Sequence, residues 1–450
     1  MAINIMNISS IKNLISSGNY ELAINKINKL LSESNQQYSL LNLLGIALNR
    51  LGKTNEALEV FDNAIKLSPD KSAAFINKGI LLVSIQKYDE AISIFNDAVN
   101  VDYSNPSVHF SLALALETAG DITNSITEYE TAIRLDPNNH NAYTNLGMLY
   151  LLIGNYEKGW EYYEHRFYTG ELKRAELPGI RWEGNIDKDK TLYVYADQGF
   201  GDVIQFSRFL KYARKRVGRL IFECQSELYP IMTSIEGVDE LVITSPDFSP
   251  QAEYDLQVPL MSIPFTLKIN ANLFSAKTPY LKIIRNKTNY WKLFFNRFSG
   301  YRIGIVWRGN PIFMKNNLRS TQLNYFTLFS KNNIKLFSFQ KGATSEEQEI
   351  MKTNGIIDLS DKLKDFGDTA AALSQLDLLI STDTSVPHLA GALDIKTWLL
   401  LSKIPDWRWG LNEAITPWYS SFKIYRQKES GNWEQVFKLI NNDLNKFVKE

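Results

Sequence analysis

The stretch Ile380–Leu393, with the sequence ISTDTSVPHLAGAL, carries the pattern that decides the fold of the C-terminal half. An apolar run, residues 378–380, leads into small polar residues, and a run of small and apolar residues follows. This order predicts a strand, a tight turn and a helix. The first N–H groups of a helix are unpaired and lie at the positive end of its dipole, so they attract anions.

The polar residues of this turn predict a phosphate site. The hydroxyls of Thr382, Thr384 and Ser385 stand next to the expected start of the helix. Ligands of open α/β sheets bind beyond the carboxyl ends of the strands, so a nucleotide pyrophosphate is expected here. His388, in the first helical turn, is expected to donate to a phosphate or a ribose. The alternative, which stays open, is that residues 383–385 only cap the helix while His388 packs beneath it.

Length and composition restrict the class of protein. A chain of 450 residues suggests two or three domains, and the 49 basic residues equal the 49 acidic ones, so no overall field favours nucleic acid or an anionic membrane. Cys224 is the only cysteine and there are four histidines. We therefore expect no disulfide within the chain, no metal and no cofactor. No apolar run approaches the ~18 residues of a membrane span, and no leader is visible, so a cytoplasmic location is predicted.

An internal repeat fills the N-terminal third. A shift of 34 residues superimposes Gly45 on Gly79, Ala57 on Ala91, Phe61 on Phe95 and Ala64 on Ala98. Further copies occupy residues 112–137 and 143–163, and a degenerate copy occupies residues 4–37. Small and large residues recur together, and a proline ends two of the copies, at Pro69 and Pro137. The pattern resembles the tetratricopeptide repeat (TPR), which implies an all-α superhelix of stacked helix pairs.

Such an array predicts a protein partner. TPR superhelices bind an extended peptide or a partner helix on the concave face. Asn42, Asn77 and Asn145 are spaced along the expected inner helices, where paired hydrogen bonds from their amides are expected to hold the backbone of an acceptor protein. The alternatives are solvated asparagines, and an array that acts only as a spacer or in dimerisation. An oligomer is possible.

Strands and helices alternate after a junction. Around the junction, aromatic residues accompany Arg166 and Arg181, which predicts a packed connection and not a flexible tether. Strands are predicted at residues 191–196, 220–224, 240–244 and 254–258, and then at 302–307, 335–339, 356–358, 376–380 and 397–401. This alternation predicts an α/β region of two Rossmann-like lobes with a cleft between them. A final helix, residues 433–448, is expected to pack across the join.

The predicted domains follow from these patterns. They are a TPR region (1–167), a junction (168–190), a first lobe (191–285), a second lobe (286–428) and a C-terminal helix (429–450). The first strand of the first lobe runs into a glycine-rich turn and then a helix, residues 203–217. Gly199 and Gly201 let that turn approach a ligand closely.

Several motifs together resemble one enzyme family. They are GFGDVIQFSR (199–208), GIVWRGNP (304–311), SFQKG (338–342), the turn at 381–393, PDWRW (405–409), PWY (417–419) and YRQ (425–427). From about residue 191 to residue 427 the chain resembles GT-B glycosyltransferases of the heptosyltransferase-like kind. The whole chain resembles bacterial glycosyltransferases in which such a domain follows TPR repeats, in a layout related to that of protein O-glycosyltransferases.

The resemblance implies roles for individual residues. Asp202 falls at the catalytic-base position, where a carboxylate accepts the proton of the attacking hydroxyl; the alternative is a helix cap. Lys315 and Arg319 match basic positions that stabilise the departing nucleotide without a metal, and the alternative is a solvated loop charge. Lys341 is a second candidate for that role.

The resemblance also implies a donor site. Asp383, Thr384 and His388 fit the family's phosphate turn, although Ser385 stands where heptosyltransferases usually have glycine. Trp407, Arg408 and Trp409 are expected to wall the pocket; the alternative is that the tryptophans belong to the core. The remaining predicted contacts to the nucleotide sugar are Gly199, Gly201, Asn310, Gln340 and Thr382.

The predicted function is therefore metal-independent transfer of a sugar to Ser or Thr of a protein, such as flagellin. A second hypothesis is transfer to a lipid-linked or capsular saccharide, with the repeats serving assembly. A third is a scaffold without catalytic activity. The base and sugar of the donor and the stereochemical outcome stay open.

Overall fold

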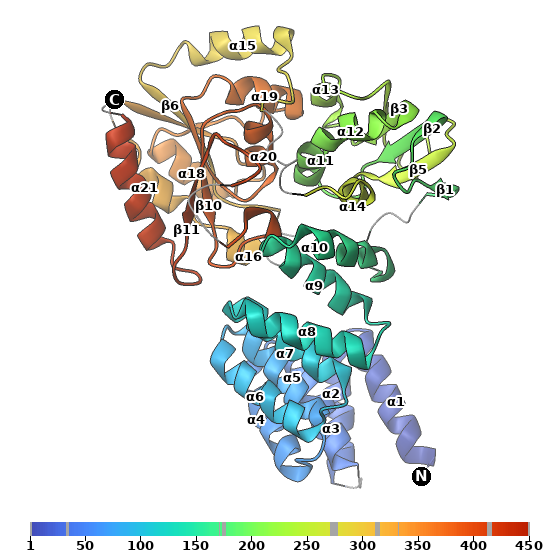
Figure 1. Cartoon of the computed structure of the whole chain (residues 1–450). Helices are drawn as coiled ribbons and strands as arrows, with labels where there is room; N and C mark the ends of the chain where they lie inside the picture. Colours follow the sequence, from blue (N-terminus) through green and yellow to red (C-terminus); the bar gives the residue numbers. More distant parts are fainter. Residues whose placement is uncertain are drawn as a thin grey trace. The chain divides into compact units, whose positions relative to one another are not determined.

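The computed structural model describes residues 2–32, 36–170, 172, 177–270, 278–310, 316–331, 333–411 and 416–448 (Figure 1). They form two compact units, Met1–Leu149 and Tyr150–Glu450. Lys315, which the sequence singles out, lies outside the described residues.

The first unit is an array of antiparallel helix pairs. From α1 to α8 each helix packs on the next, and α5 also packs on α3 and on α7, so these three form the inner row of helices. The helices are α1 (Ala2–Ser16), α2 (Tyr20–Leu31), α3 (Gln37–Arg50), α4 (Thr54–Leu67), α5 (Ser72–Ser84), α6 (Tyr88–Val101), α7 (Pro106–Ala119), α8 (Ile122–Leu135) and α9 (His140–Leu152), the last of which runs into the second unit.

The repeated residues explain why the helices pair so closely. Phe61 and Phe95, which are 1% exposed, lie against Gly45 and Gly79 of the preceding helices. Any side chain at either glycine would overlap a phenylalanine ring, because a Cβ would lie 2.5 Å from a ring carbon. The predicted all-helical repeat is confirmed.

The second unit begins with α10 (Tyr156–Tyr163) and the short helix η1 (Glu164–Tyr168). Its first sheet is parallel, in the order β1-β5-β2-β3-β4. The strands are β1 (Ile180–Arg181), β2 (Asp187–Tyr195), β3 (Val217–Cys224), β4 (Glu240–Ile243) and β5 (Leu256–Pro259). The helices are α11 (Phe200–Phe206), η2 (Ser207–Phe209), α12 (Leu210–Arg214), α13 (Tyr229–Met232), η3 (Leu260–Ser262) and α14 (Ile263–Thr266). Strand β1 was not predicted.

The second sheet is also parallel, in the order β11-β10-β9-β6-β7-β8. Its strands are β6 (Tyr301–Val306), β7 (Ile334–Ser338), β8 (Ile357–Asp358), β9 (Leu378–Thr382), β10 (Thr397–Leu401) and β11 (Phe422–Arg426). The helices are α15 (Arg285–Phe295), α16 (Asn316–Arg319), α17 (Asn324–Thr327), α18 (Ser345–Thr353), α19 (Phe366–Leu373), α20 (Ser385–Ala392), η5 (Trp407–Trp409) and α21 (Glu434–Phe447). The predicted α/β alternation is confirmed, and β11 was not predicted as a strand.

The C-terminal helix α21 does not fulfil the expectation that it crosses the join. It packs on β11, and its apolar residues Phe437, Ile440 and Leu444 enter a core made of residues from the second sheet and its helices. The amphipathic face of α21 therefore closes one side of the second sheet next to β11.

Parallel strands align their carboxyl ends, and this places the polar turns. Strand β2 ends before the glycine-rich turn and α11, while β9 ends before the threonine-rich turn and α20. Both strands are buried where they reach these turns, as expected of parallel sheets covered by helices. Helices α11 and α20 pack on each other, so the two turns meet.

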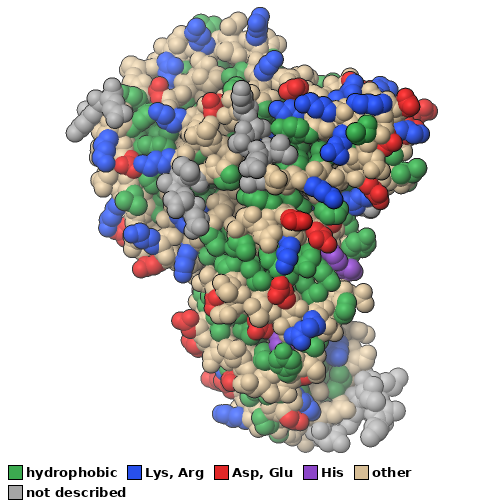
Figure 2. Space-filling model, viewed as in Figure 1, with side chains coloured by type: hydrophobic (Ala, Val, Ile, Leu, Met, Phe, Trp, Pro, Cys, Tyr) green, Lys and Arg blue, Asp and Glu red, His purple; other side chains and the backbone are tan. Residues whose placement is uncertain are grey.

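Basic and acidic side chains are mixed on the face of the molecule shown in Figure 2. In Figure 2 they are interspersed over both units, consistent with their equal totals. None of the helices in the described part of the chain is long and apolar enough to cross a bilayer.

We predict that Gly79→Ala destabilises the helical array although alanine favours helices. Alanine contributes about 1 kcal/mol through helix propensity, but overpacking against the buried Phe95 ring costs about 1–3 kcal/mol. Urea unfolding, followed by circular dichroism, should show the array unfolding at lower urea concentration. Adding Phe95→Leu makes room for the methyl group and should recover part of the loss; a Gly79→Ala variant that is more stable than the parent would contradict the packing argument.

Candidate functional site

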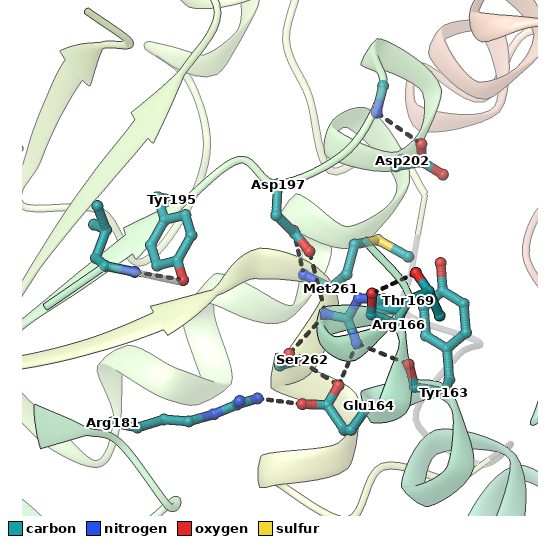
Figure 3. Close-up of polar contacts among 12 residues, drawn as sticks. Tyr163, Glu164, Arg166, Thr169, Arg181, Tyr195, Asp197, Asp202, Met261 and Ser262 are labelled. Carbon is teal, nitrogen blue, oxygen red and sulfur yellow. Dashed lines mark hydrogen bonds and ion pairs between the residues drawn. The ribbon is translucent and has the colours of Figure 1, made fainter. Parts of the chain in front are cut away.

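Asp202 occupies the third position of helix α11. One carboxylate oxygen, Oδ2, accepts the backbone N–H of Gly199 at 3.0 Å and so braces the start of the helix (Figure 3). The other, Oδ1, forms an ion pair with the guanidinium of Arg408. The side chain is 23% exposed, which leaves one edge open to a ligand. Asp202 therefore caps the helix, as in the alternative hypothesis, and also keeps part of its carboxylate exposed.

Arg408 comes from η5, after the second sheet's strand β10. Its Nη1 lies 2.7 Å from Asp406 Oδ1, and the same oxygen accepts the backbone N–H of Arg408 at 3.1 Å. The guanidinium lies over the Trp407 ring, 4.2 Å from its centroid. Arg408 was predicted as a wall of the donor pocket; in the structure it holds two carboxylates, Asp202 from the first lobe and Asp406 from the second.

The threonine-rich turn has the predicted strand-turn-helix form. Thr384 caps α20, and its side chain accepts the N–H of Val386 at 3.3 Å. His388 is 4% exposed; its Nδ1 lies 3.0 Å from the Tyr419 hydroxyl, and its ring stacks on Trp409. His388 Nε2 lies 3.9 Å from Asp383 Oδ1. The turn thus caps a helix, as in the alternative hypothesis, and also holds a buried histidine and carboxylate.

The two turns meet at Gly201. A Cβ at this glycine would lie 2.9 Å from Cδ2 of His388 and 3.5 Å from Cα of Ser385. Only glycine allows α11 and α20 to approach so closely. Asp202, His388 and Ser385 are therefore brought to one place, although they follow different sheets.

Burial and neighbouring charges set the ionisation of this group. Burial raises the pKa of Asp202, against the attraction of Arg408. Burial and then Asp406 raise the pKa of Asp383 to about 6, while Arg319 acts in the opposite direction. Burial, with the charge of Arg408 next in size, holds the pKa of His388 well below its usual range. The histidine is therefore neutral at neutral pH and acts as a hydrogen-bonding group.

Other predicted donor residues brace loops. Gln340 Oε1 accepts the backbone N–H groups of Arg308 (3.0 Å) and Trp307 (3.3 Å), which fixes the turn after β6. Lys341 Nζ donates to the carbonyls of Leu363, at 2.6 Å, and Ser360. Both side chains therefore brace neighbouring loops through these hydrogen bonds.

Arg319 lies beside Gly309, in the turn after β6. A Cβ on Gly309 would lie 2.7 Å from Arg319 Nη2, so this glycine makes room for the guanidinium. The charge of Arg319 acts on Asp202, Asp383 and His388 alike. Asn310, which follows Gly309, is exposed.

The structure adds two polar groups, from Arg426 and Gln427, to the predicted Thr382. Thr382 Oγ1, Arg426 Nη1 and Gln427 Nε2 are buried and have no hydrogen-bond partner among the described residues. They stand at the ends of β9 and β11, which both pair with β10, so they share the carboxyl edge of the second sheet. Leaving such an atom without a partner costs about 1–3 kcal/mol, so each calls for an ordered water or a ligand atom. The Tyr-Arg-Gln motif after an apolar run was the available signal.

The candidate acceptor-binding asparagines are engaged with neighbouring side chains. Asn77 Nδ2 donates to Asn42 Oδ1 at 2.9 Å, which links α5 to α3 in the inner row. Asn145 Nδ2 donates to the Tyr129 hydroxyl at 3.2 Å. All three are partly exposed.

Comparison with family models covers the helical part. Residues 7–116 match the N-terminal TPR repeats region of Psidin, and residues 118–154 match the model described as TPR repeat. The helical array is made of tetratricopeptide repeats. Repeats of this kind support a role in protein interaction or as a scaffold.

One curated relative extends beyond the array. Protein FlbA of Caulobacter vibrioides is 23% identical over 329 residues, which cover 66% of this chain and 54% of the relative. The chain thus spans about half the length of that relative. Solved structures with similar helices include MamA of Desulfovibrio magneticus RS-1 (23% identity, 36% of this chain and 90% of that one, TM-score 0.30) and a thermophilic TPR protein of Thermus thermophilus (19%, 36% and 90%, TM-score 0.33).

We predict that Asp383→Asn makes the second unit less sensitive to pH. Because the folded-state pKa of Asp383 is about 6 and its ordinary value is 3.8, the folded state binds the proton more tightly than the unfolded state. This group's contribution to stability therefore falls as pH rises from about 4 to about 6. Asparagine cannot ionise, so denaturant unfolding from pH 4 to pH 7 should show a shallower decline. The exposed Asp189→Asn is the control; an equally steep decline in both variants would exclude Asp383 as the source.

Proposed function

We propose that residues 150–450 form a metal-independent glycosyltransferase of the GT-B kind, which transfers a sugar from a nucleotide sugar to a protein recruited by the TPR array. The observation that supports the proposal is the meeting of the Gly-Asp-Val turn and the threonine-rich turn at Gly201 and His388. We propose that the Asp202 carboxylate, the N-terminus of α20 and the neighbouring arginines serve one ligand position, since this transfer requires such a set.

In the proposed reaction Asp202 is the general base. The hydroxyl oxygen of the acceptor attacks the anomeric carbon, its proton passes to Asp202, and the bond from that carbon to the nucleotide phosphate breaks with its electron pair on the phosphate. Burial makes the Asp202 carboxylate more basic than an exposed one, while the ion pair with Arg408 keeps it ionised and aimed.

The negative charge that develops on the nucleotide needs fixed positive groups. Arg319 and the first N–H groups of α20 supply them without a metal, with hydroxyls of Thr382 and Ser385 as further donors. The unsatisfied atoms of Thr382, Arg426 and Gln427 are the groups that polar atoms of the donor would complete. Lys315 retains its proposed role in phosphate binding.

The acceptor is proposed to be a protein because the enzyme-like unit follows TPR repeats in one chain. The inner row that contains α3 and α5 is the proposed contact surface, with Asn42 and Asn77 at its polar positions. Ser or Thr hydroxyls, flagellin among them, are the proposed targets.

We predict that Asp202→Asn lowers turnover by about 10²- to 10⁴-fold, the usual contribution of a general base, while the donor nucleotide still binds. Thermal stabilisation by UDP, GDP, ADP or CMP identifies the nucleotide and measures its binding. Intact-mass analysis of a co-expressed acceptor then measures sugar addition.

The control for this variant is Asp394→Asn, next to the other end of α20. Asp394 accepts from the Thr278 hydroxyl at 2.9 Å, a contact that asparagine can also make, so this variant should keep full activity. Full turnover by Asp202→Asn would refute the assigned base. Absence of stabilisation by every nucleotide would favour the scaffold hypothesis.

We predict that deletion of residues 2–149 abolishes sugar addition to the protein acceptor but preserves stabilisation by the nucleotide, because residues 150–450 form a compact unit. Circular dichroism verifies that the shortened chain is folded. Continued transfer to a saccharide acceptor by the shortened chain would instead support the hypothesis in which the repeats serve assembly alone.

A further inference from the structure

The segment α10–η1 packs in the second unit, although α10 falls within the last copy of the repeat, residues 143–163. Trp160 of α10 is 2% exposed, and its indole Nε1 donates to the carbonyl of Ile269 at 3.0 Å. Its ring meets the rings of Phe206 and Trp407 edge-on, with centroids 5.9 Å and 5.4 Å away. Phe206 is on α11 with Asp202, and Trp407 directly precedes Arg408. One side chain of α10 therefore supports both partners of the Asp202–Arg408 ion pair.

A buried polar cluster extends this support to the loop before α11 (Figure 3). Arg166 of η1 is 3% exposed; its Nη2 donates to Ser262 Oγ at 2.8 Å and to Asp197 Oδ2 at 3.2 Å. The other Asp197 oxygen accepts the N–H of Met261 at 3.2 Å. Asp197 opens the turn that leads through Gly199 to Asp202, so Arg166 fixes the beginning of this turn.

The charges in this cluster depend on one another. Arg166 also pairs with Glu164, which accepts the Ser262 hydroxyl at 2.9 Å. The side chain of Asp197 is 1% exposed, and burial raises its pKa while Arg166 opposes the rise. Removing one member of a buried pair leaves an uncompensated charge, a change that is strongly destabilising. Without Arg166, Asp197 must therefore take up a proton or move towards water, and the turn moves with it.

We propose that α10–η1 is a positioning element of the transfer site, in which Arg166 sets the turn that carries Asp202 and Trp160 sets the contact between Asp202 and Arg408. This inference rests on the proposed function for the chemistry but not for the geometry. Neither residue touches the proposed substrates; both act through the neighbours of Asp202. A misplacement of about 1 Å is enough to reduce turnover by about 10²-fold.

The test compares Arg166→Met, Arg166→Lys and Arg181→Met in the full chain. Arg181 is the matched control, because it also pairs with Glu164 but is 31% exposed, whereas the buried Arg166 pairs with Asp197 as well. The measurements are kcat, KM for the nucleotide sugar, the pH profile of kcat/KM, and hydrogen exchange of the peptide covering residues 197–206. Trp160→Phe and Trp160→Ala form a second pair, which tests the packing of Trp160 on Trp407, the residue before Arg408.

For Arg166→Met we expect kcat to fall by at least about 10-fold with KM changed by less than about 3-fold, because the donor is held by the second lobe. The acidic limb of the pH profile should move, since displacement of Asp202 changes both its burial and its contact with Arg408, the two largest influences on its pKa. Exchange should rise within residues 197–206, where the Gly199 N–H is bonded to Asp202. Arg166→Lys should recover part of each change. Trp160→Ala should lower kcat and raise exchange more than Trp160→Phe does. Arg181→Met should have the kcat, pH profile and exchange of the parent.

Unchanged kcat and unchanged exchange in Arg166→Met would overturn the proposal. It would also be overturned by an increase in exchange spread evenly over residues 150–450 with an unmoved pH profile, because that result describes general destabilisation. If the parent chain transfers no sugar, the proposed function fails, and hydrogen exchange alone decides: an increase confined to residues 197–206 supports the positioning role, and no local increase refutes it.

Discussion

The ion pair between Asp202 and Arg408 is the constraint on which the rest of the site depends. It joins a helix that follows the first sheet to a loop that follows the second, and it is largely removed from water. Arg208 adds a neighbouring link, since this buried side chain donates to the Trp418 carbonyl at 3.0 Å and to the Tyr280 hydroxyl at 3.1 Å. Buried charges of this kind contribute little net stability but strongly penalise alternative arrangements of the two sheets.

The pairing of a buried carboxylate with an arginine recurs around the site. Asp197, Asp202 and Asp383 are three carboxylates whose pKa is raised by burial, and each has an arginine whose charge opposes that rise, namely Arg166, Arg408 and Arg319. Carboxylates with a shifted pKa are enriched at functional sites, and they also occur in structural ion-pair networks.

The sequence predicts elements well and distant partners poorly. The repeats could be predicted because Gly45 and Phe61, a small and a large residue, recur together, and the sheets because apolar runs alternate with helical patterns. Strand β1 has only two residues, and the exposed Lys423 interrupts the buried positions of β11, so neither stands out as a buried strand. The contacts within the site could not be predicted in this way. Arg408 and Asp202 are 206 residues apart, and no local sequence pattern indicates that they pair. The aromatic residues near Arg166 predict a packed junction, but its partner Ser262 is 96 residues away.

The placement of α10 bears on how such chains can be assembled by recombination. A repeat array is ordinarily exchangeable at any boundary between copies, because each copy touches only its neighbours. Here α10, the last helix of the last copy, is committed to the other unit through Trp160, and η1, which directly follows it, through Arg166. A new array can therefore be joined only upstream of Tyr156, and whichever array is acquired must end on a helix that fits this inherited α10.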